Sequence, residues 1–384
     1  MALIVDRLAH QTKILVGKRL GSYLSRQYWL GKGPAGRLIS VFSDELKQIG
    51  VDQTIVIDPI PVIKAAPDYF LEGTIESEYR NRFLTSESFT EKAGIFSARN
   101  VEVSFPTSMH QVGGHILNEV MLAPYLLTNP KYYFGLRSMR FTRKRPMDEG
   151  ILLSMPFYHN FYHWLIEILP RLISYDRCPS LHHVPLIVPK AAPAFVAETL
   201  RLAGYLSKTV FLENGTYRFK KLHMLSKLSS ILEVSPDAIA WLNDKFKDVG
   251  ARRVTPKNIY ISRGDAKIRF VSNEPQLAEV LTDFGFETMA MSGLSIPDQI
   301  NLFRNAQYVI GAHGAAFANL AFAKPGATFI EFFSRGHYAP CFNRIAGIRG
   351  LKYGFLVGDP TRMGGFEINP DHLRAILVEA VRAP

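Results

Sequence analysis

Five strand and helix pairs follow one another in the last third of the chain, and this alternation restricts the possible fold more than any other feature. Short apolar runs typical of buried strands alternate with amphipathic stretches of helical period. The pairs occupy residues 258–284, 287–306, 308–324, 328–346 and 353–381. Because such alternation is the pattern of a parallel sheet with helical crossovers, the sequence predicts a Rossmann-like domain over residues 258–384.

A second alternating region precedes this domain. Strands are expected at 150–155, 184–188, 209–212 and 219–225, and helices at 160–176, 193–205 and 236–249. They predict a first Rossmann-like domain over 150–250, joined to the second by a polar linker at 251–257. Residues 1–149 combine a basic start with short apolar stretches between Pro, Gly and Asn, which indicates an irregular or β-rich segment. The predicted fold class is α/β, with two Rossmann-like domains facing a cleft.

Composition and charge narrow the class of protein. With 47% hydrophobic and 21% charged residues, the chain is typical of a globular protein with real cores. The longest apolar runs are shorter than a membrane span and the start does not resemble a signal peptide, so a cytoplasmic location is expected. Cys178 and Cys341 are too few for a disulfide framework.

The formal net charge is +11, and residues 1–40 hold seven basic residues against one acidic residue. This excess favours an anionic partner such as a phosphorylated substrate, an acidic polysaccharide or the inner face of a membrane, where the protein would be peripheral. A plain solvated basic surface stays an alternative. Nucleic acid is not an expected partner, because no binding motif is recognisable.

A glycine-rich turn lies inside the third strand and helix pair, in the stretch YVIGAHGAAFANLAFAKPGATFIE at 308–331. Small residues at Gly311, Gly314 and Ala315 would let an anion approach the backbone where the next helix begins, and a diphosphate fits that description. Glu331, on the following strand, could accept hydrogen bonds from ribose hydroxyls. A tightly packed structural turn with an incidental His313 is the alternative.

The predicted helix at 160–176 carries a second candidate site. At 100° per residue, its polar side chains share one face opposite a leucine and isoleucine stripe; they are Asn160, His163, Glu167 and Arg171. A carboxylate one turn from an imidazole can orient it as a general base. Aromatic residues that include Tyr162 and Trp164 crowd the same turn. A solvent-facing polar stripe is the alternative, and a metal site is not expected because no third ligand follows.

Two arginines follow the first strand of the second domain. Arg263 and Arg269 are well placed to bind phosphate oxygens through paired donors at a strand's carboxyl end. A surface salt bridge between Arg263 and Asp265 is equally compatible with the sequence.

Together these three stretches resemble glycosyltransferase family 61, over about residues 150–335. The matching residues are Asn160, His163, Trp164, Glu167, Ser262, Arg263, Arg269, Asn273, Glu274, Gly311, His313, Gly314, Ala315, Asn319, Pro325, Gly326 and Glu331. The resemblance implies a GT-B fold, an inverting transfer from a nucleotide sugar to a glycan, as in capsular polysaccharide biosynthesis, and no obligatory metal. Ala316 departs from the glycine common in the family, and residues 1–100 lie outside the resemblance.

An inverting transfer needs a base for the acceptor hydroxyl and a site that stabilises the departing diphosphate, and these needs suggest roles for the candidate residues. His163 is expected to act as base with Glu167 orienting it, or Glu167 as base itself. A UDP-linked donor, with no separate cofactor, is expected to bind at Arg263, Arg269, Gly311, His313, Gly314, Ala315, Asn319 and Glu331. The acceptor side is assigned to Asn160, Tyr162, Trp164 and Arg171. Two rival functions are a non-catalytic nucleotide-sugar or glycan-binding protein and a transferase of a non-sugar group such as pyruvate.

Overall fold

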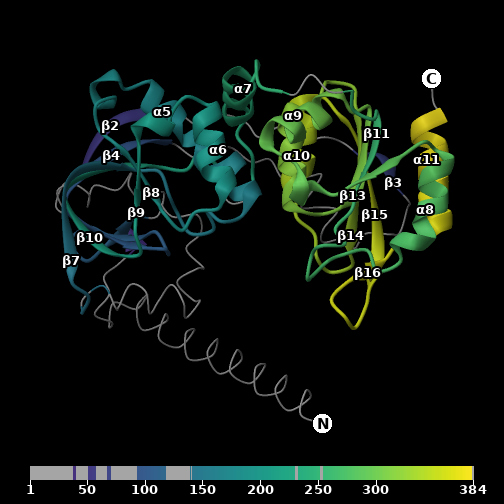
Figure 1. Ribbon diagram of the computed structural model, residues 1–384, viewed down its shortest axis with the longest axis horizontal. Helices are drawn as coiled ribbons and strands as arrows, with labels where there is room; N and C mark the ends of the chain where they lie inside the picture. The colour runs from purple at the N-terminus through teal and green to yellow at the C-terminus, as the bar shows by residue number, and fades with distance from the viewer. Residues whose placement is uncertain are drawn as a thin grey trace, which may run out of the picture.

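Two seven-stranded sheets form the framework of the protein, each with helices packed on it (Figure 1). The computed structural model describes residues 93–117, 139, 141–229, 232–250 and 254–382, together with the short strands at 38–39, 51–57 and 67–70. The basic amino-terminal segment at 1–37 therefore lies outside the described residues.

The first sheet has the strand order β2-β4-β10-β7-β8-β9, with β5 beside β4. Its strands are β2 (Val51–Ile57), β4 (Ala93–Phe105), β5 (Met109–Gln111), β7 (Lys144–Leu152), β8 (Leu186–Pro189), β9 (Thr209–Leu212) and β10 (Gly215–Leu225). Strands β10, β7, β8 and β9 are parallel, whereas β2, β4 and β5 add an antiparallel part. The boundary predicted between residues 149 and 150 falls inside β7, so the β-rich amino-terminal part and the first α/β region share one sheet.

The second sheet has the order β12-β11-β13-β14-β15-β16, which in chain order reads 2-1-3-4-5 for its first five strands. These strands are β11 (Asn258–Ile261), β12 (Glu287–Met289), β13 (Tyr308–Ala312), β14 (Thr328–Ser334), β15 (Lys352–Pro360) and β16 (Phe366–Glu367). All pair in parallel except β16, as expected for a Rossmann-like arrangement. An additional strand from the amino-terminal part, β3 (Pro67–Phe70), pairs with β15. The two sheets therefore do not correspond to two consecutive stretches of sequence.

Helices cover both faces of the second sheet. On one face lie α8 (Glu274–Asp283) and α11 (Pro370–Arg382), and on the other α9 (Ile296–Asn305), η8 (Ala315–Phe322) and α10 (Cys341–Arg349) (Figure 1). The helix predicted at 315–324 is thus a shorter 3-10 helix. The remaining elements are β1 (Leu38–Ile39), β6 (Ile116–Leu117), η3 (His163–Ile168), η4 (Leu169–Arg171), α5 (Leu172–Asp176), η5 (Pro179–Leu181), α6 (Ala194–Leu202), η6 (Leu206–Lys208), α7 (Pro236–Lys245) and η7 (Met291–Gly293).

One cluster of buried apolar side chains spans the two halves. Helix α7 lies between them in Figure 1, and its end packs on the second half through Phe246 and Phe322, whose ring centroids are 5.7 Å apart. The side-chain amide of Asn243 donates to the carbonyl of Ala321 at 2.7 Å. A continuous cluster of buried apolar side chains runs from Ile95 to Phe355 through both halves. Elements of the first half are thereby held against the helices that follow β13 and β14.

The helix predicted at 160–176 is irregular. Residues 163–168 form a π-helix, in which the N–H of Leu169 donates to the carbonyl of Trp164, and residues 169–171 form a 3-10 turn. Pro170 explains the change, because it has no N–H to donate and its ring would collide with an α-helical carbonyl. A regular 100° rotation per residue therefore does not describe this segment, and both Glu167 and Arg171 are buried.

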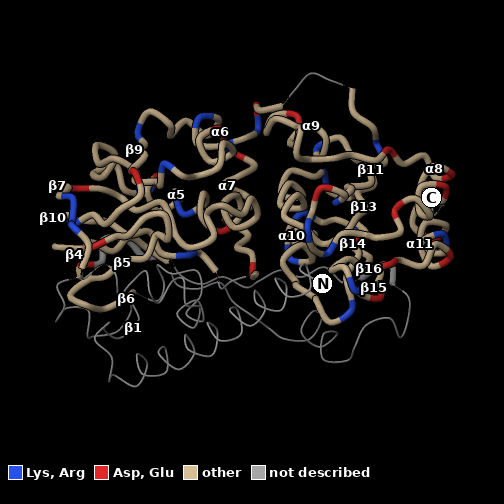
Figure 2. Tube along the Cα trace, turned by 60° about the horizontal axis from the view of Figure 1, so that its bottom comes forward, with Lys and Arg blue, Asp and Glu red and all other residues tan. Residues whose placement is uncertain are grey.

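No helix in the described part of the chain is long and apolar enough to cross a membrane. Cys178 and Cys341 are buried and not bonded to each other. Basic and acidic residues are interspersed over both halves of the described chain in the view of Figure 2.

Candidate active site

The loops that follow β11 and β13 meet at the carboxyl edge of the second sheet. Arg263 follows β11, and His313 and Gly314 follow β13, its parallel neighbour. The helices change face between these two strands, and ligands of doubly wound sheets bind at such a switch point. The residues of the predicted anion site therefore lie at this switch point, and the binding of an anion there stays a prediction.

Glu274, the first residue of α8, holds the loop after β11. Its carboxylate accepts from the hydroxyls of Tyr260 at 2.8 Å and Ser262 at 2.7 Å and from the N–H of Arg263 at 3.3 Å. Three hydrogen bonds to one carboxylate fix the backbone from which the arginine projects. Glu274 thus supports Arg263 from behind.

Arg263 and Arg269 bring two guanidinium groups to this edge. Within the described chain Arg263 forms no ion pair, so the alternative of a bridge to Asp265 is not observed; its Nη2 donates to the carbonyl of Ile268 at 3.3 Å. Arg269 donates through Nη1 to Nε2 of His337. The Nε of each arginine is buried and has no partner in the described structure. Burial lowers the pKa of both groups, and an anion would relieve the cost of burying two cations.

His313 is oriented by the fully buried Glu331. Its Nδ1 lies 2.5 Å from Glu331 Oε1, and Tyr353 donates its hydroxyl to the other carboxyl oxygen at 3.0 Å. Burial raises the pKa of Glu331 well above its usual value. Burial, with Arg269 and Arg263 adding repulsion, lowers the pKa of His313 to about 3. Both shifts favour an uncharged pair, in which the carboxylic acid donates to Nδ1 and the ring presents Nε2–H as a neutral donor.

A second histidine and glutamate pair lies in the first half. His163 Nδ1 is 2.7 Å from Glu167 Oε2, and the other oxygen of Glu167 accepts the N–H of Leu232 at 3.1 Å. The ring of His163 stacks on Phe157, with centroids 5.3 Å apart, and Asn160 accepts the N–H groups of Tyr162 and His163 at the start of the helix. With Nδ1–H donated to the carboxylate, Nε2 carries a lone pair and can accept a proton.

The two histidines of these pairs, His163 and His313, line one cavity of about 380 Å³. Its lining comprises Asn160, Tyr162, His163, Leu232, Arg269, His313, Gly314, Ala315, His337, Tyr338, Ala339, Cys341 and Phe342. A smaller hollow of about 170 Å³ around Arg263 shares Gly314 and Ala315 with it. The structure thus brings six predicted side chains and two predicted backbone positions to two adjoining hollows.

Two acceptor-side predictions are wrong. Arg171 is buried, and its guanidinium donates to the carbonyls of Glu167 and Leu225, both at 3.0 Å. Trp164 is fully buried and donates to the hydroxyl of Thr199 at 2.8 Å. Both side chains support the π-helical segment from inside and line neither hollow of the site.

Three donor-side predictions also need correction. Glu331 is buried behind His313 and is not available to ribose hydroxyls. Asn319 is fully buried and donates to Gln299 at 2.9 Å. At Gly311 a Cβ would lie 2.6 Å from the carbonyl oxygen of Ile261, so this glycine is required by the packing of β13 on β11. These residues shape the site without lining it.

Several lining residues have little or no signal in the sequence. His337 and Tyr338 follow β14 at the carboxyl edge, and that position could have indicated them. Phe342 packs between the two sides, with its ring centroid 4.9 Å from that of His313 and 5.5 Å from that of Tyr162. Leu232 had no sequence signal, because it reaches the site only through the tertiary fold.

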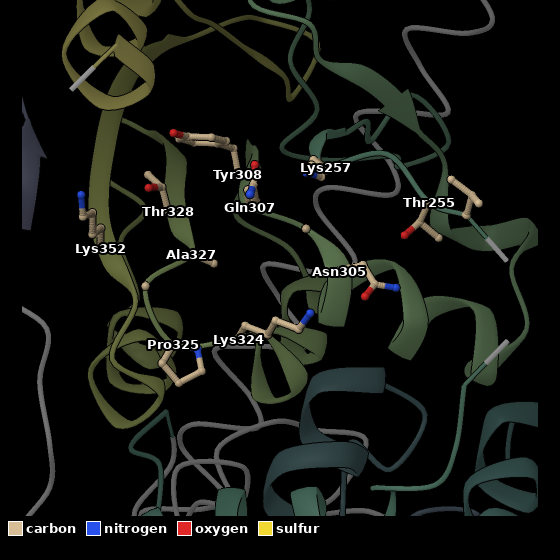
Figure 3. A pocket seen from close by; sticks show the side chains of 13 residues that line it. Thr255, Lys257, Asn305, Gln307, Tyr308, Lys324, Pro325, Ala327, Thr328 and Lys352 are labelled. Carbon is tan, nitrogen blue, oxygen red and sulfur yellow. The ribbon is translucent and has the colours of Figure 1, made fainter. Parts of the chain in front are cut away.

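A larger hollow of about 680 Å³ lies at the opposite, amino-terminal edge of the second sheet. Figure 3 shows its polar lining, which includes Lys257, Lys324 and Lys352. None of the predicted site residues lines it, and α/β sheets bind ligands at the other edge. Within the described ranges, no three His, Cys, Asp or Glu side chains gather in a way that could hold a metal ion.

Fold and site together define an α/β protein with two sheets. Arg263 and Arg269 lie at the switch point of its second sheet, and the His163 and Glu167 pair lies on the other side of the site. The sequence model of the family Glycosyltransferase 61 matches residues 161–330. This match confirms, over that segment, the resemblance expected from the sequence.

Two further similarities are more limited. A stretch of 63 residues is 35% identical to a beta-1,2-xylosyltransferase from Arabidopsis thaliana; it covers 16% of this chain and 12% of that protein. Among solved structures, E. coli heptosyltransferase WaaC with ADP is similar with a TM-score of 0.31 and 10% identity, over 61% of this chain and 100% of that one. A structural likeness this low supports no conclusion about the GT-B arrangement.

Proposed function

We propose that this protein is an inverting glycosyltransferase that moves a sugar from a nucleotide-sugar donor to a glycan acceptor. One observation carries the proposal: His163 with Glu167, on one side, and Arg263, Arg269 and His313, on the other, lie around two adjoining hollows. The family match over residues 161–330 supports it.

In the proposed reaction, an acceptor hydroxyl oxygen bonds to the anomeric carbon of the donor while the bond from that carbon to the phosphate oxygen breaks. His163 Nε2 takes the hydroxyl proton, and the bonding electron pair leaves with the nucleoside diphosphate. Arg263, Arg269 and the Nε2–H of His313 stabilise the charge that develops on the leaving group. These cationic and neutral donors allow a reaction that needs no metal ion.

The finer details of the proposal follow the family resemblance. We propose a UDP-linked sugar, a GT-B arrangement of the two halves and a role in capsular or other surface polysaccharide synthesis. The cytoplasmic location and peripheral attachment to an anionic membrane are part of the same proposal, and the attachment rests on the charge of residues 1–40. Co-sedimentation with anionic vesicles that falls steeply with added salt would support the attachment.

A transfer assay tests the activity. The protein is incubated with a panel of UDP-sugars and glycan acceptors, and release of UDP is measured together with the glycan product. His163→Ala should lower the rate by roughly 10² to 10⁴ while UDP affinity stays nearly unchanged. His372→Ala, at an exposed histidine of α11, is the matched control.

Two outcomes would contradict the proposal. Tight UDP-sugar binding without transfer to any acceptor would favour a non-catalytic binding protein. Stabilisation by phosphoenolpyruvate and not by nucleotide sugars in a thermal-shift panel would favour a pyruvyl-type transferase.

A further inference from the structure

The carboxylate of Glu167 is held from two directions. His163 Nδ1 contacts one oxygen at 2.7 Å, and the N–H of Leu232 donates to the other at 3.1 Å. The Glu167 side chain is only 3% exposed, so water offers little alternative support. The orientation of the imidazole therefore depends on where the backbone of residue 232 lies.

That backbone is in an unfavourable conformation. Leu232 has a φ of +64°, in the left-handed region that side chains other than glycine and asparagine rarely adopt. Such a residue keeps its conformation only when its surroundings hold it. The side chain of the next residue, Glu233, holds this backbone in place through an ion pair.

Glu233 is bound by a buried arginine from the other half of the protein. Arg344, in α10, donates through Nε to Glu233 Oε2 at 2.8 Å and through Nη2 to Oε1 at 3.3 Å. The guanidinium is 1% exposed and the glutamate side chain 20%. This bidentate contact fixes both the position and the orientation of the Glu233 carboxylate.

We propose that Arg344 is a positioning residue for the His163 and Glu167 pair and acts on it through Glu233 and the N–H of Leu232. The inference rests on the proposed function for its catalytic consequence, because it concerns the base of that reaction. Arg344 lies in the same helix as Phe342, which contacts His313, so one helix touches the donor side and sets the geometry of the base.

A double substitution separates positioning from folding. Arg344→Met with Glu233→Met removes both charges, which avoids leaving one of them buried alone. The control is Arg374→Met with Asp283→Met, which removes an exposed ion pair between α11 and α8. Both proteins are labelled with ¹⁵N-histidine, and the signals of His163 are identified by their loss in His163→Gln.

In the unmodified protein and the control, the ring nitrogens of neutral His163 should show the Nδ1–H tautomer. In the double variant they should move toward a mixture of both tautomers, and kcat should fall roughly 10- to 100-fold with UDP affinity unchanged within about twofold. An unchanged tautomer and kcat in the folded double variant would overturn the inference. If that variant does not fold, Arg344→Lys is used in the same two measurements, because lysine keeps the positive charge but cannot make the bidentate contact with Glu233. An unchanged tautomer and kcat in Arg344→Lys would again overturn the inference.

The tautomer measurement needs no substrate. Failure of the unmodified protein to transfer any sugar would count against the proposed function, whereas an altered His163 tautomer would still support the positioning role of Arg344.

Discussion

The guanidinium of Arg263 occupies the space that a side chain on Gly314 would need. A Cβ placed on residue 314 would lie 1.9 Å from Nη1 of Arg263, far inside contact distance. The glycine after His313 is thus explained by the arginine from the neighbouring loop. Gly314 leaves space for the Arg263 guanidinium. In the proposed complex, this guanidinium and the backbone of the turn contact the donor diphosphate.

Gly314→Ala should displace the Arg263 guanidinium without unfolding the protein, because the end of a long side chain can move. Affinity for UDP should fall by about 1.5 to 3 kcal/mol, the range for hydrogen bonds to charged groups. Isothermal titration calorimetry measures this loss. Gly293→Ala is the control, since a Cβ there meets no atom within 4 Å. Unchanged UDP affinity in Gly314→Ala would mean that Arg263 does not bind the diphosphate.

Glu331→Gln should leave UDP affinity within about threefold of the original, because a side-chain amide can donate to His313 Nδ1 as the protonated carboxyl group does. Glu331→Leu removes that donor, frees the ring to change tautomer and should weaken binding by roughly tenfold or more. Calorimetry of both variants checks the pair. A large loss in Glu331→Gln would show that the pair works with an ionised glutamate.

Trp164→Phe should lower stability and leave the acceptor KM unchanged. The indole N–H bonds the buried hydroxyl of Thr199 at 2.8 Å, and loss of a buried hydrogen bond costs about 1 to 3 kcal/mol. Urea unfolding measures the stability, and initial rates measure the KM. A raised KM at full stability would return Trp164 to the acceptor site.

Stability should fall as the pH drops from 6.5 to 4, in part because of the buried His110. Burial, with repulsion from Arg171, lowers its pKa from 6.5 to about 4 in the folded protein. The unfolded chain therefore binds more protons between pH 6.5 and pH 4. The contribution of neutral, buried His110 to the free energy of unfolding is complete above pH 6.5 and is lost as the pH falls to 4. At 1.36 kcal/mol per pKa unit the loss is about 3 kcal/mol. The difference between the original protein and His110→Gln in urea unfolding at both pH values isolates this share.

Local patterns predicted most elements of the second sheet. The strand at 308–312 in this sheet and the strand at 209–212 in the first sheet have the predicted bounds, because each is a short apolar run between clear turn signals. The π-helix at 163–168 was not predictable from period alone, since Pro170 changes the register only in combination with the packing around it. Strand β3 was missed because its partner β15 lies near the other end of the chain.

The candidate site was predictable where chemistry and spacing coincide. His163 and Glu167 are one turn apart, and Arg263 and His313 follow strands whose carboxyl ends are neighbours. Residue type could not show what a buried side chain contacts, so Glu331 was assigned to a ribose instead of to His313. No local pattern indicates the contacts of Leu232, Glu233 and Arg344, because these contacts form only when distant segments fold together.

The pairing of β3 with β15 has a consequence for synthesis of the protein on the ribosome. Residues 67–70 leave the exit tunnel long before their partner at 352–360 is synthesised. Until then the amino-terminal strand has no sheet to join, even when β2 and β4 on either side of it can already pair with each other. The second sheet can therefore be completed only after residues 352–360 have emerged, and until then the unpaired strand at 67–70 leaves this fold exposed to misassembly.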